Sequence, residues 1–332
     1  MKSYLIGLFL VAVLTAGSTA SQPSLRRFEY ARLRMGTSVR IVLYVPDEVQ
    51  ARQAADSAYA RIDELEQALS HYRPDSEVSR LSASSGHAER RVDPDLFRVL
   101  ATASRFSRLT GGAFDVTVGP LISLWREARR AKKMPDPVLL RQARQVVGYR
   151  NLEIKPEKQT VRLKKEGMKL DLSAIAKGYV ADQALLVLNS KGIKSALVDA
   201  GGDIVLSDPP PGRPGWRVAV QKSDADTPPS RSLVLHNTAI ATSGDAYQYV
   251  ELNGKRYSHI LDPRTGLGTT DAASATVIAA DGMTADSLAT ALCVMAPDEG
   301  IRLIESLPGV SAQVVRRTPA GIKHYRSAGF PP

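Results

Sequence analysis

Cysteine is almost absent from this chain of 332 residues, which contains Cys293 alone. No intrachain disulfide can therefore form, and the core must be held together by packing, although exported proteins often use several disulfides. Cys293 lies in the apolar segment "TADSLATALCVM" (284–295), where we expect a small core residue rather than a nucleophile. A disulfide-framework protein is excluded.

Several motifs that mark common enzyme classes are missing as well. The chain has no G-x-G-x-x-G, no P-loop, no H-E-x-x-H and no G-x-S-x-G. These absences argue against Rossmann dehydrogenases, P-loop NTPases, zinc proteases and serine hydrolases. The histidines are few and scattered, so a histidine-rich metal cluster is not supported: His71, His87, His236, His259 and His324.

The longest apolar run, from Tyr4 to Ala16, follows Lys2 and precedes small residues at 17–20. It is short for a membrane span, which needs about 20 residues. The pattern predicts a secretory signal peptide over 1–20, with an uncleaved anchor as the alternative, and a single domain over 21–332. We therefore expect export to the periplasm. No cysteine follows the segment, so a lipid anchor is not expected.

The net charge is +10, and many cations fall in short runs such as 129–133 and 164–165. Runs of this kind are usually solvated faces. Nucleic acid is an unexpected partner for an exported protein. We expect an anionic small molecule as ligand, or association with a membrane surface.

Apolar periodicity and turn signals predict a mixture of helices and strands. The expected helices are 47–69, 94–109, 174–192, 284–295 and 298–306. The expected strands and hairpins are 28–45, 151–165, 168–173, 195–206 with a glycine interruption, 249–260 around Asn253-Gly254, 273–280, and a hairpin after 306. Because strands and helices do not alternate regularly, we predict an α+β fold with largely antiparallel sheets.

Two segments of the chain combine turns with groups that can carry chemistry. In "DLSAIAKGYVADQA", Asp171 precedes a helix whose free N–H groups and positive end suit phosphate, and Lys177 adds a cation. The alternative is that Asp171 or Ser173 only caps the helix. In "SHILDPRTG", Asp262 begins a tight turn, and His259 is either a surface residue or a general base.

A carboxylate also stands in the otherwise apolar segment 284–295. Asp286 and Thr290 are four residues apart, so a helix places them on one face. One interpretation is that Asp286 is a helix N-cap, although Asp281 or Thr284 could serve equally. The other is a site for a hard cation such as Mg²⁺, which prefers oxygen ligands.

Taken together, the chain resembles the ApbE family, the FAD:protein FMN transferases. The resemblance rests on five motifs in the family's order, over about residues 28–315: "GAFDVTVGPL", "DLSAIAKGYVAD", "VDAGGDI", "SHILDPRTG" and "ADSLATAL". Ala289 departs from the serine that many members carry, and the lipid-anchoring cysteine of many members is absent.

The resemblance implies roles for particular residues. The positions that match FAD contacts are Met35, Tyr72, Ala113, Phe114, Asp115, Asp171, Lys177 and Leu261. The positions that match Mg²⁺ ligands are Asp286, Thr290 and Ala174, the last through its backbone carbonyl. The carboxylate in the apolar helix is then explained as a metal ligand.

The implied chemistry is transfer of FMN from FAD to a threonine hydroxyl of a target flavoprotein in a membrane redox complex, with release of AMP. His259 is our candidate for the base that orients or deprotonates the hydroxyl. Two alternatives stay open from the sequence: hydrolysis of FAD to FMN and AMP, and a non-catalytic flavin-binding envelope protein. A basic envelope-binding module without a defined ligand is a third.

Overall fold

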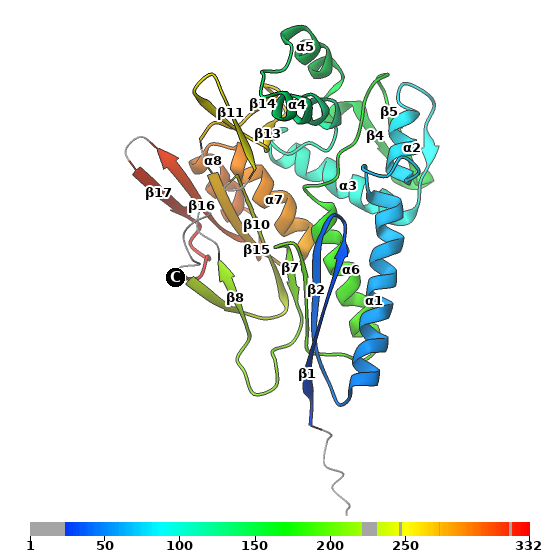
Figure 1. The fold of residues 1–332 in the computed structure, drawn as a ribbon, viewed down its shortest axis with the longest axis vertical. Coiled ribbons are helices and arrows are strands. Elements are labelled where there is room, and N and C mark those ends of the chain that lie inside the picture. Colours follow the sequence, from blue (N-terminus) through cyan, green and yellow to red (C-terminus); the bar gives the residue numbers. More distant parts are fainter. Residues whose placement is uncertain (1–23, 221–230, 246–247, 272, 319–320) are drawn as a thin grey trace, which may run out of the picture.

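The computed structural model describes residues 24–220, 231–245, 248–271, 273–318 and 321–332 (Figure 1). The predicted signal peptide, 1–20, lies outside the described residues. Within these ranges, none of the helices has both the length and the hydropathy that crossing a bilayer requires.

An eight-stranded sheet runs through the molecule, in the order β1-β2-β6-β7-β10-β15-β16-β17, and every neighbouring pair is antiparallel. The strands are β1 (Arg26–Arg34), β2 (Thr37–Val45), β6 (Ala196–Ala200), β7 (Ile204–Leu206), β10 (Thr238–Gly244), β15 (Ala273–Ala279), β16 (Ser311–Thr318) and β17 (Gly321–Arg326). This arrangement confirms the predicted α+β class.

Helices cover one face of this sheet and form the main core (Figure 1). They are α1 (Glu48–Leu69), α6 (Ala176–Ser190), α7 (Gly282–Val294) and α8 (Pro297–Glu305), and α3 (Pro94–Leu109) joins the core by packing against α1 and α7. Alternate residues of β2 point to opposite faces: Ile41 and Leu43 pack into this core, whereas Val42 faces the other way. There the hairpin of β8 (Trp216–Val220) and β9 (Arg231–Leu235) covers the sheet.

Smaller elements gather at one end of the sheet, at the top of Figure 1. They are α2 (Glu77–Ala83), α4 (Gly119–Ala131), α5 (Pro137–Val146), a sheet of β3 (Arg90–Arg91), β4 (Leu152–Lys155) and β5 (Thr160–Leu163), two 3-10 turns (Tyr149–Asn151 and Pro156–Lys158), and the hairpins β11 (Tyr249–Leu252) with β12 (Lys255–Ser258) and β13 (Leu261–Asp262) with β14 (Leu267–Gly268). A separate apolar cluster joins α4 and α5 to these hairpins.

Two predicted strands are wrong. Segment 168–173 makes one isolated parallel bridge, Val118 with Lys169, and a turn follows it. Segment 195–206 is a hairpin of β6 and β7 rather than one strand, because Gly201 and Gly202 both adopt positive φ angles, 70° and 100°. The backbone at Gly201 also lies close to Thr37 at the start of β2, since a Cβ on Gly201 would lie 2.5 Å from Thr37 Oγ1.

Candidate functional site

Several of the predicted site residues lie around the N-terminal end of α6. Asp171 and Ala174 precede this helix, and Lys177 is in its first turn. Asp171 Oδ1 accepts hydrogen bonds from Ser173 N and Ser173 Oγ, at 3.0 and 2.6 Å, and so fixes the turn that leads into α6. The helix itself has no side-chain cap, because its N-cap residue is Ile175.

Asp286 reaches this end of α6 from the neighbouring helix. Its Oδ2 accepts a hydrogen bond from Gly178 N at 3.2 Å, which satisfies one free N–H group of the first turn. Asp281 caps α7, accepting from Thr284 N at 2.8 Å, so the N-cap interpretation of Asp286 is wrong. Burial raises the pKa of the Asp286 carboxyl to about 7, the charge of Asp203 adds to this shift, and Lys177 opposes it.

Lys177 forms an ion pair with Asp203, a buried residue in the turn between β6 and β7. Burial alone would lower the pKa of Lys177, but the charges of Asp203 and Asp286 outweigh burial and raise it. Burial raises the pKa of Asp203, and Lys177 opposes that shift. A single cation, Lys177, therefore interacts with two buried carboxylates, and the local charge is negative when both carboxylates are ionised.

Close contact between α6 and α7 makes this arrangement possible. A Cβ on Gly178 would lie 2.1 Å from Gly282 O, so only glycine allows the two helices to approach this closely. Asp182, one turn further along α6, accepts hydrogen bonds from Gly282 N and Met283 N at 2.7 and 3.0 Å. Burial raises the pKa of Asp182 to about 7, although these two bonds oppose the shift.

The donor atoms near Asp286 suit a hard cation. Thr290 stands one turn after Asp286 on α7, and its Oγ1 lies 3.0 Å from Ser243 Oγ. Within the described part of the chain, Gly178 N is the only hydrogen-bond donor to the Asp286 carboxylate. No group of three His, Cys, Asp or Glu side chains positioned for a metal occurs in that part. A carboxylate and hydroxyls, completed by water, nevertheless form a donor set that Mg²⁺ accepts.

A chain of contacts leads from Asp171 to the arginines of α4. His71 Nε2 lies 3.2 Å from Asp171 Oδ2, and the rings of His71 and Tyr72 are 4.0 Å apart. The guanidinium of Arg126 stands 5.0 Å from the centre of the Tyr72 ring. Burial and the charge of Arg126 lower the pKa of Arg129, three residues further along α4, and Tyr72 opposes this shift. Two partly buried cations thus flank this predicted flavin contact.

His259 lies near the same cations. Its Nδ1 is 3.0 Å from the backbone oxygen of Gln248, an acceptor, so Nδ1 carries the proton and Nε2 has the free lone pair. Burial lowers the pKa of His259, the bond to Gln248 raises it, and the charges of Arg129 and Lys177 lower it further. The imidazole is therefore neutral at pH 7, the form that a general base requires.

The predicted residues of "GAFD" face inward. Ala113 and Phe114 are buried, and Phe114 packs edge-on against Phe106 with ring centres 6.5 Å apart. Asp115 accepts from Thr117 N and Oγ1, at 2.8 and 2.7 Å, and from a further backbone N–H at 2.6 Å. Burial raises the pKa of Asp115, although these bonds oppose the shift. These side chains therefore fix the conformation of the loop between α3 and α4.

Met35 and Leu261 are two further predicted FAD contacts, and both have apolar side chains. Met35 begins the turn between β1 and β2 with φ 51°, and its N–H donates to Glu66 Oε2 at 3.1 Å. Leu261 is buried against Leu121 and Trp125 of α4. Asp262 accepts from Arg264 N at 2.9 Å, so the expected tight turn after Leu261 is confirmed.

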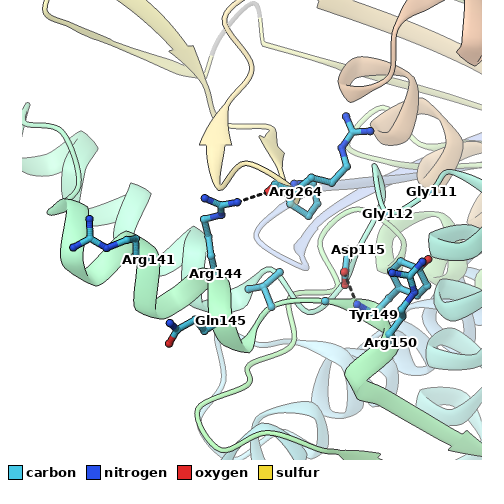
Figure 2. Close-up of a pocket in the computed structure, with 12 residues that line it drawn as sticks. Gly111, Gly112, Asp115, Arg141, Arg144, Gln145, Tyr149, Arg150 and Arg264 are labelled. Carbon is cyan, nitrogen blue, oxygen red and sulfur yellow. Dashed lines mark hydrogen bonds between the residues drawn. The ribbon is translucent and has the colours of Figure 1, made fainter.

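A pocket of about 520 Å³ lies between α5, the loop around Tyr149 and the turn at Arg264 (Figure 2). Of the predicted site residues, only Asp115 lines it. The pocket is therefore distinct from the cluster at α6, but the two are linked, because Asp171 N donates to Val116 O, one residue after Asp115, at 2.8 Å.

Sequence reasoning missed four groups in the site: Asp203, His71, Arg126 and Arg129. Asp203 stands in the quoted motif "VDAGGDI", so its position after a pair of glycines was an available signal. Arg129 is in the basic run 129–133, which the charge pattern assigned to a solvated face, and Arg126 precedes that run; the three-residue spacing on α4 puts the two together.

The fold and this cluster define an α+β protein that places cations, buried carboxylates and a neutral histidine around one helix start. Comparison with known proteins agrees with the resemblance found in the sequence. The family model described as the ApbE family matches residues 35–314. The chain belongs to the ApbE family.

Its relatives share most of its length. An FAD:protein FMN transferase of Vibrio cholerae is 34% identical over 303 residues, which cover 90% of this chain and 90% of that protein. One of Treponema pallidum is 31% identical over 323 residues, covering 92% and 89%. The solved structure of the flavin transferase ApbE from Vibrio cholerae superposes with a TM-score of 0.82 at 32% identity, covering 92% of this chain and 98% of that one. The apo form of the Pseudomonas stutzeri flavinyl transferase ApbE gives 0.80 at 28%, covering 92% and 96%.

Proposed function

We propose that this protein is a Mg²⁺-dependent FAD:protein FMN transferase. The observation that carries the proposal is the convergence of Lys177 and Asp286 on the first turn of α6. A helix N-terminus and a lysine suit the pyrophosphate of FAD, and a buried carboxylate suits a divalent cation. The names of the relatives, which share up to 34% identity, support the same activity.

In the proposed reaction, the hydroxyl oxygen of an acceptor threonine attacks the FMN-side phosphorus of FAD. A new P–O bond joins FMN to the acceptor, and the P–O bond to the AMP portion breaks, so AMP leaves with the bridging oxygen. His259 Nε2 takes the hydroxyl proton, which its neutral state allows. A positioned base contributes about 10²- to 10⁴-fold to the rate.

Mg²⁺, when bound, would neutralise the phosphate oxygens and stabilise the charge that develops on them. Asp286, Thr290 and the carbonyl of Ala174 would hold it. Lys177 would share the charge of the pyrophosphate from the protein side. The buried carboxylates of Asp203 and Asp286, served by one lysine, support a second cation here.

The remaining predicted residues would hold the flavin dinucleotide. Tyr72 offers a ring that is 68% exposed, suitable for stacking. Because Ala113, Phe114 and Asp115 are buried, this segment would shape the wall of the dinucleotide site. Met35 and Leu261 would supply apolar contacts, and Asp171 would orient the contact region through His71.

We also propose that the protein is exported by residues 1–20 and works in the periplasm. Its acceptor would be a flavoprotein subunit of a membrane redox complex. The net charge of +10 would favour approach to an anionic membrane surface.

Membrane extract incubated with the protein, FAD and Mg²⁺ tests the proposal. We expect an acceptor band with flavin fluorescence that survives denaturing electrophoresis, and a mass gain on one of its threonines equal to FMN. Asp286→Ala should abolish the gain, and the control Asp298→Ala, at an exposed position of α8, should keep it. If FAD yields only free FMN and AMP, the activity is hydrolysis. If FAD stays intact, the protein is a flavin-binding protein.

A further inference from the structure

The pocket beside the α6 cluster is surrounded by arginines from separate segments (Figure 2). Arg141 and Arg144 stand one turn apart on α5, Arg150 is in the following 3-10 turn, and Arg264 is in the turn between β13 and β14. All four are exposed at the surface. Arg144 Nη2 donates to Arg264 O at 2.9 Å, which ties the two sides of the pocket together.

The positive charge of this pocket is not balanced. Arg264 pairs with Asp262, at 2.9 Å. No ion pair with a carboxylate forms at Arg141, Arg144 or Arg150 in the described ranges. Among the described residues, the only carboxylate in the lining is Asp115, which is buried and accepts hydrogen bonds with both of its oxygens. Arginines around a cavity that form no ion pair with a carboxylate of their own chain are suited to bidentate contacts with the carboxylates or phosphates of a ligand.

The position of the pocket indicates which anion it serves. Its turn at 262–266 follows His259 by three residues and is fixed to α4, because Trp125 Nε1 donates to Gly266 O at 2.8 Å. Neither Tyr72 nor Lys177, both predicted to contact FAD, lines the pocket. His259 does not line the pocket either, but the turn that follows it does, through Pro263 and Arg264. An occupant would therefore lie against the segment that carries the base, where we expect the peptide around an acceptor hydroxyl to pass.

We propose that this pocket binds an acidic segment of the acceptor protein, with Asp or Glu carboxylates paired to Arg141, Arg144 and Arg150. The inference rests on the proposed transfer reaction, because that reaction requires a protein partner next to His259. Rim arginines on an open surface fit an extended peptide, which reaches several of them at once.

Fluorescence anisotropy with a labelled short peptide, in which a threonine is flanked by Asp and Glu, tests the inference without any chemistry on FAD. We expect the protein to bind this peptide at least about tenfold more tightly than the same peptide with Asn and Gln. The double variant Arg141→Ala/Arg144→Ala should lose that preference. The matched control Lys132→Ala/Lys133→Ala removes two exposed cations outside the pocket and should keep it.

The single variant Arg141→Glu guards against misfolding of the double variant, because Arg141 is exposed and makes no hydrogen bond within the described part of the chain. It should likewise remove the preference, because both variants lower the charge of the pocket by two, while the thermal melting curve stays unchanged. Three results would overturn the inference: equal binding of the two peptides, equal loss in the lysine control, or displacement of the acidic peptide by ADP or inorganic phosphate. If the wild-type protein binds the acidic peptide but does not cleave FAD, the result would instead count against the proposed function alone.

Discussion

Replacing Gly178 by alanine tests whether the close contact of α6 and α7 assembles the site. The added Cβ would lie 2.1 Å from Gly282 O, 2.4 Å from its carbonyl carbon and 2.8 Å from Met283 N. These are backbone atoms that no side-chain rotation can move. An ordinary contact needs more than 3.4 Å, so the helices must separate by about 1 Å or more at this point.

Two costs follow from that separation. Overpacking of this kind lowers the free energy of unfolding by about 1–3 kcal/mol, which corresponds to a fall in Tm of roughly 5 °C. The separation also pulls Asp286 away from Gly178 N, to which it is bonded at 3.2 Å. Because misplacement by 1 Å costs on the order of 10²-fold in rate, transfer should fall far more than stability does.

Calorimetry and a transfer assay on the same preparations measure the two effects. The matched control is Gly300→Ala on α8, where the added Cβ meets the flexible end of Leu292, at 2.5 Å from its Cδ2. That variant should change stability by less than about 1 kcal/mol and leave transfer intact. Wild-type activity in Gly178→Ala would refute the argument that this crossing positions Asp286.

Further predictions concern titratable groups. His259→Ala should leave the Kd for FAD unchanged and lower transfer by about 10²- to 10⁴-fold, measured by mass spectrometry; unchanged transfer would remove His259 from the mechanism. Because the pKa of His259 is lowered, wild-type transfer should stay high at pH 7 and fall as pH drops through that pKa, and the alanine variant should lack this limb. Because the pKa of Asp182 is raised to about 7, this residue stabilises the folded protein below pH ~4, and the contribution is lost as pH rises through about 7. In urea titrations, Asp182→Asn should therefore flatten the decline of the unfolding free energy with pH, by up to a few kcal/mol.

Long elements with regular patterns were predictable from the sequence. The helix over 94–109 was predicted at both ends, because Asp93 and Pro94 begin it and glycine follows it. The hairpin at Asn253-Gly254 was predicted because an Asn-Gly pair favours the positive φ angles of a two-residue turn. Both residues adopt such angles, 54° and 72°. Helices α4 and α5 were not predicted, because their charged residues outweighed an apolar stripe that becomes clear only when it packs on the hairpins.

Part of the site followed from the sequence and part did not. The pairing of Asp286 with Thr290 depends only on helical spacing, and it could be read directly. The contact of Asp286 with α6 depends on a crossing of two helices more than 100 residues apart in the sequence, set by Gly178 and Gly282. The ion pair of Lys177 with Asp203 depends on the turn between β6 and β7, and the sequence predicted this segment as one strand with a glycine interruption rather than a hairpin.

The central claim is that Asp286 holds a divalent cation against the dinucleotide at the start of α6. The most direct test is to measure the Kd for FAD, by quenching of flavin fluorescence, while Mg²⁺ is titrated into wild-type protein and into Asp286→Ala. We predict that Mg²⁺ tightens FAD binding in the wild type and has no effect in the variant. The same Mg²⁺ dependence in both proteins would contradict the claim.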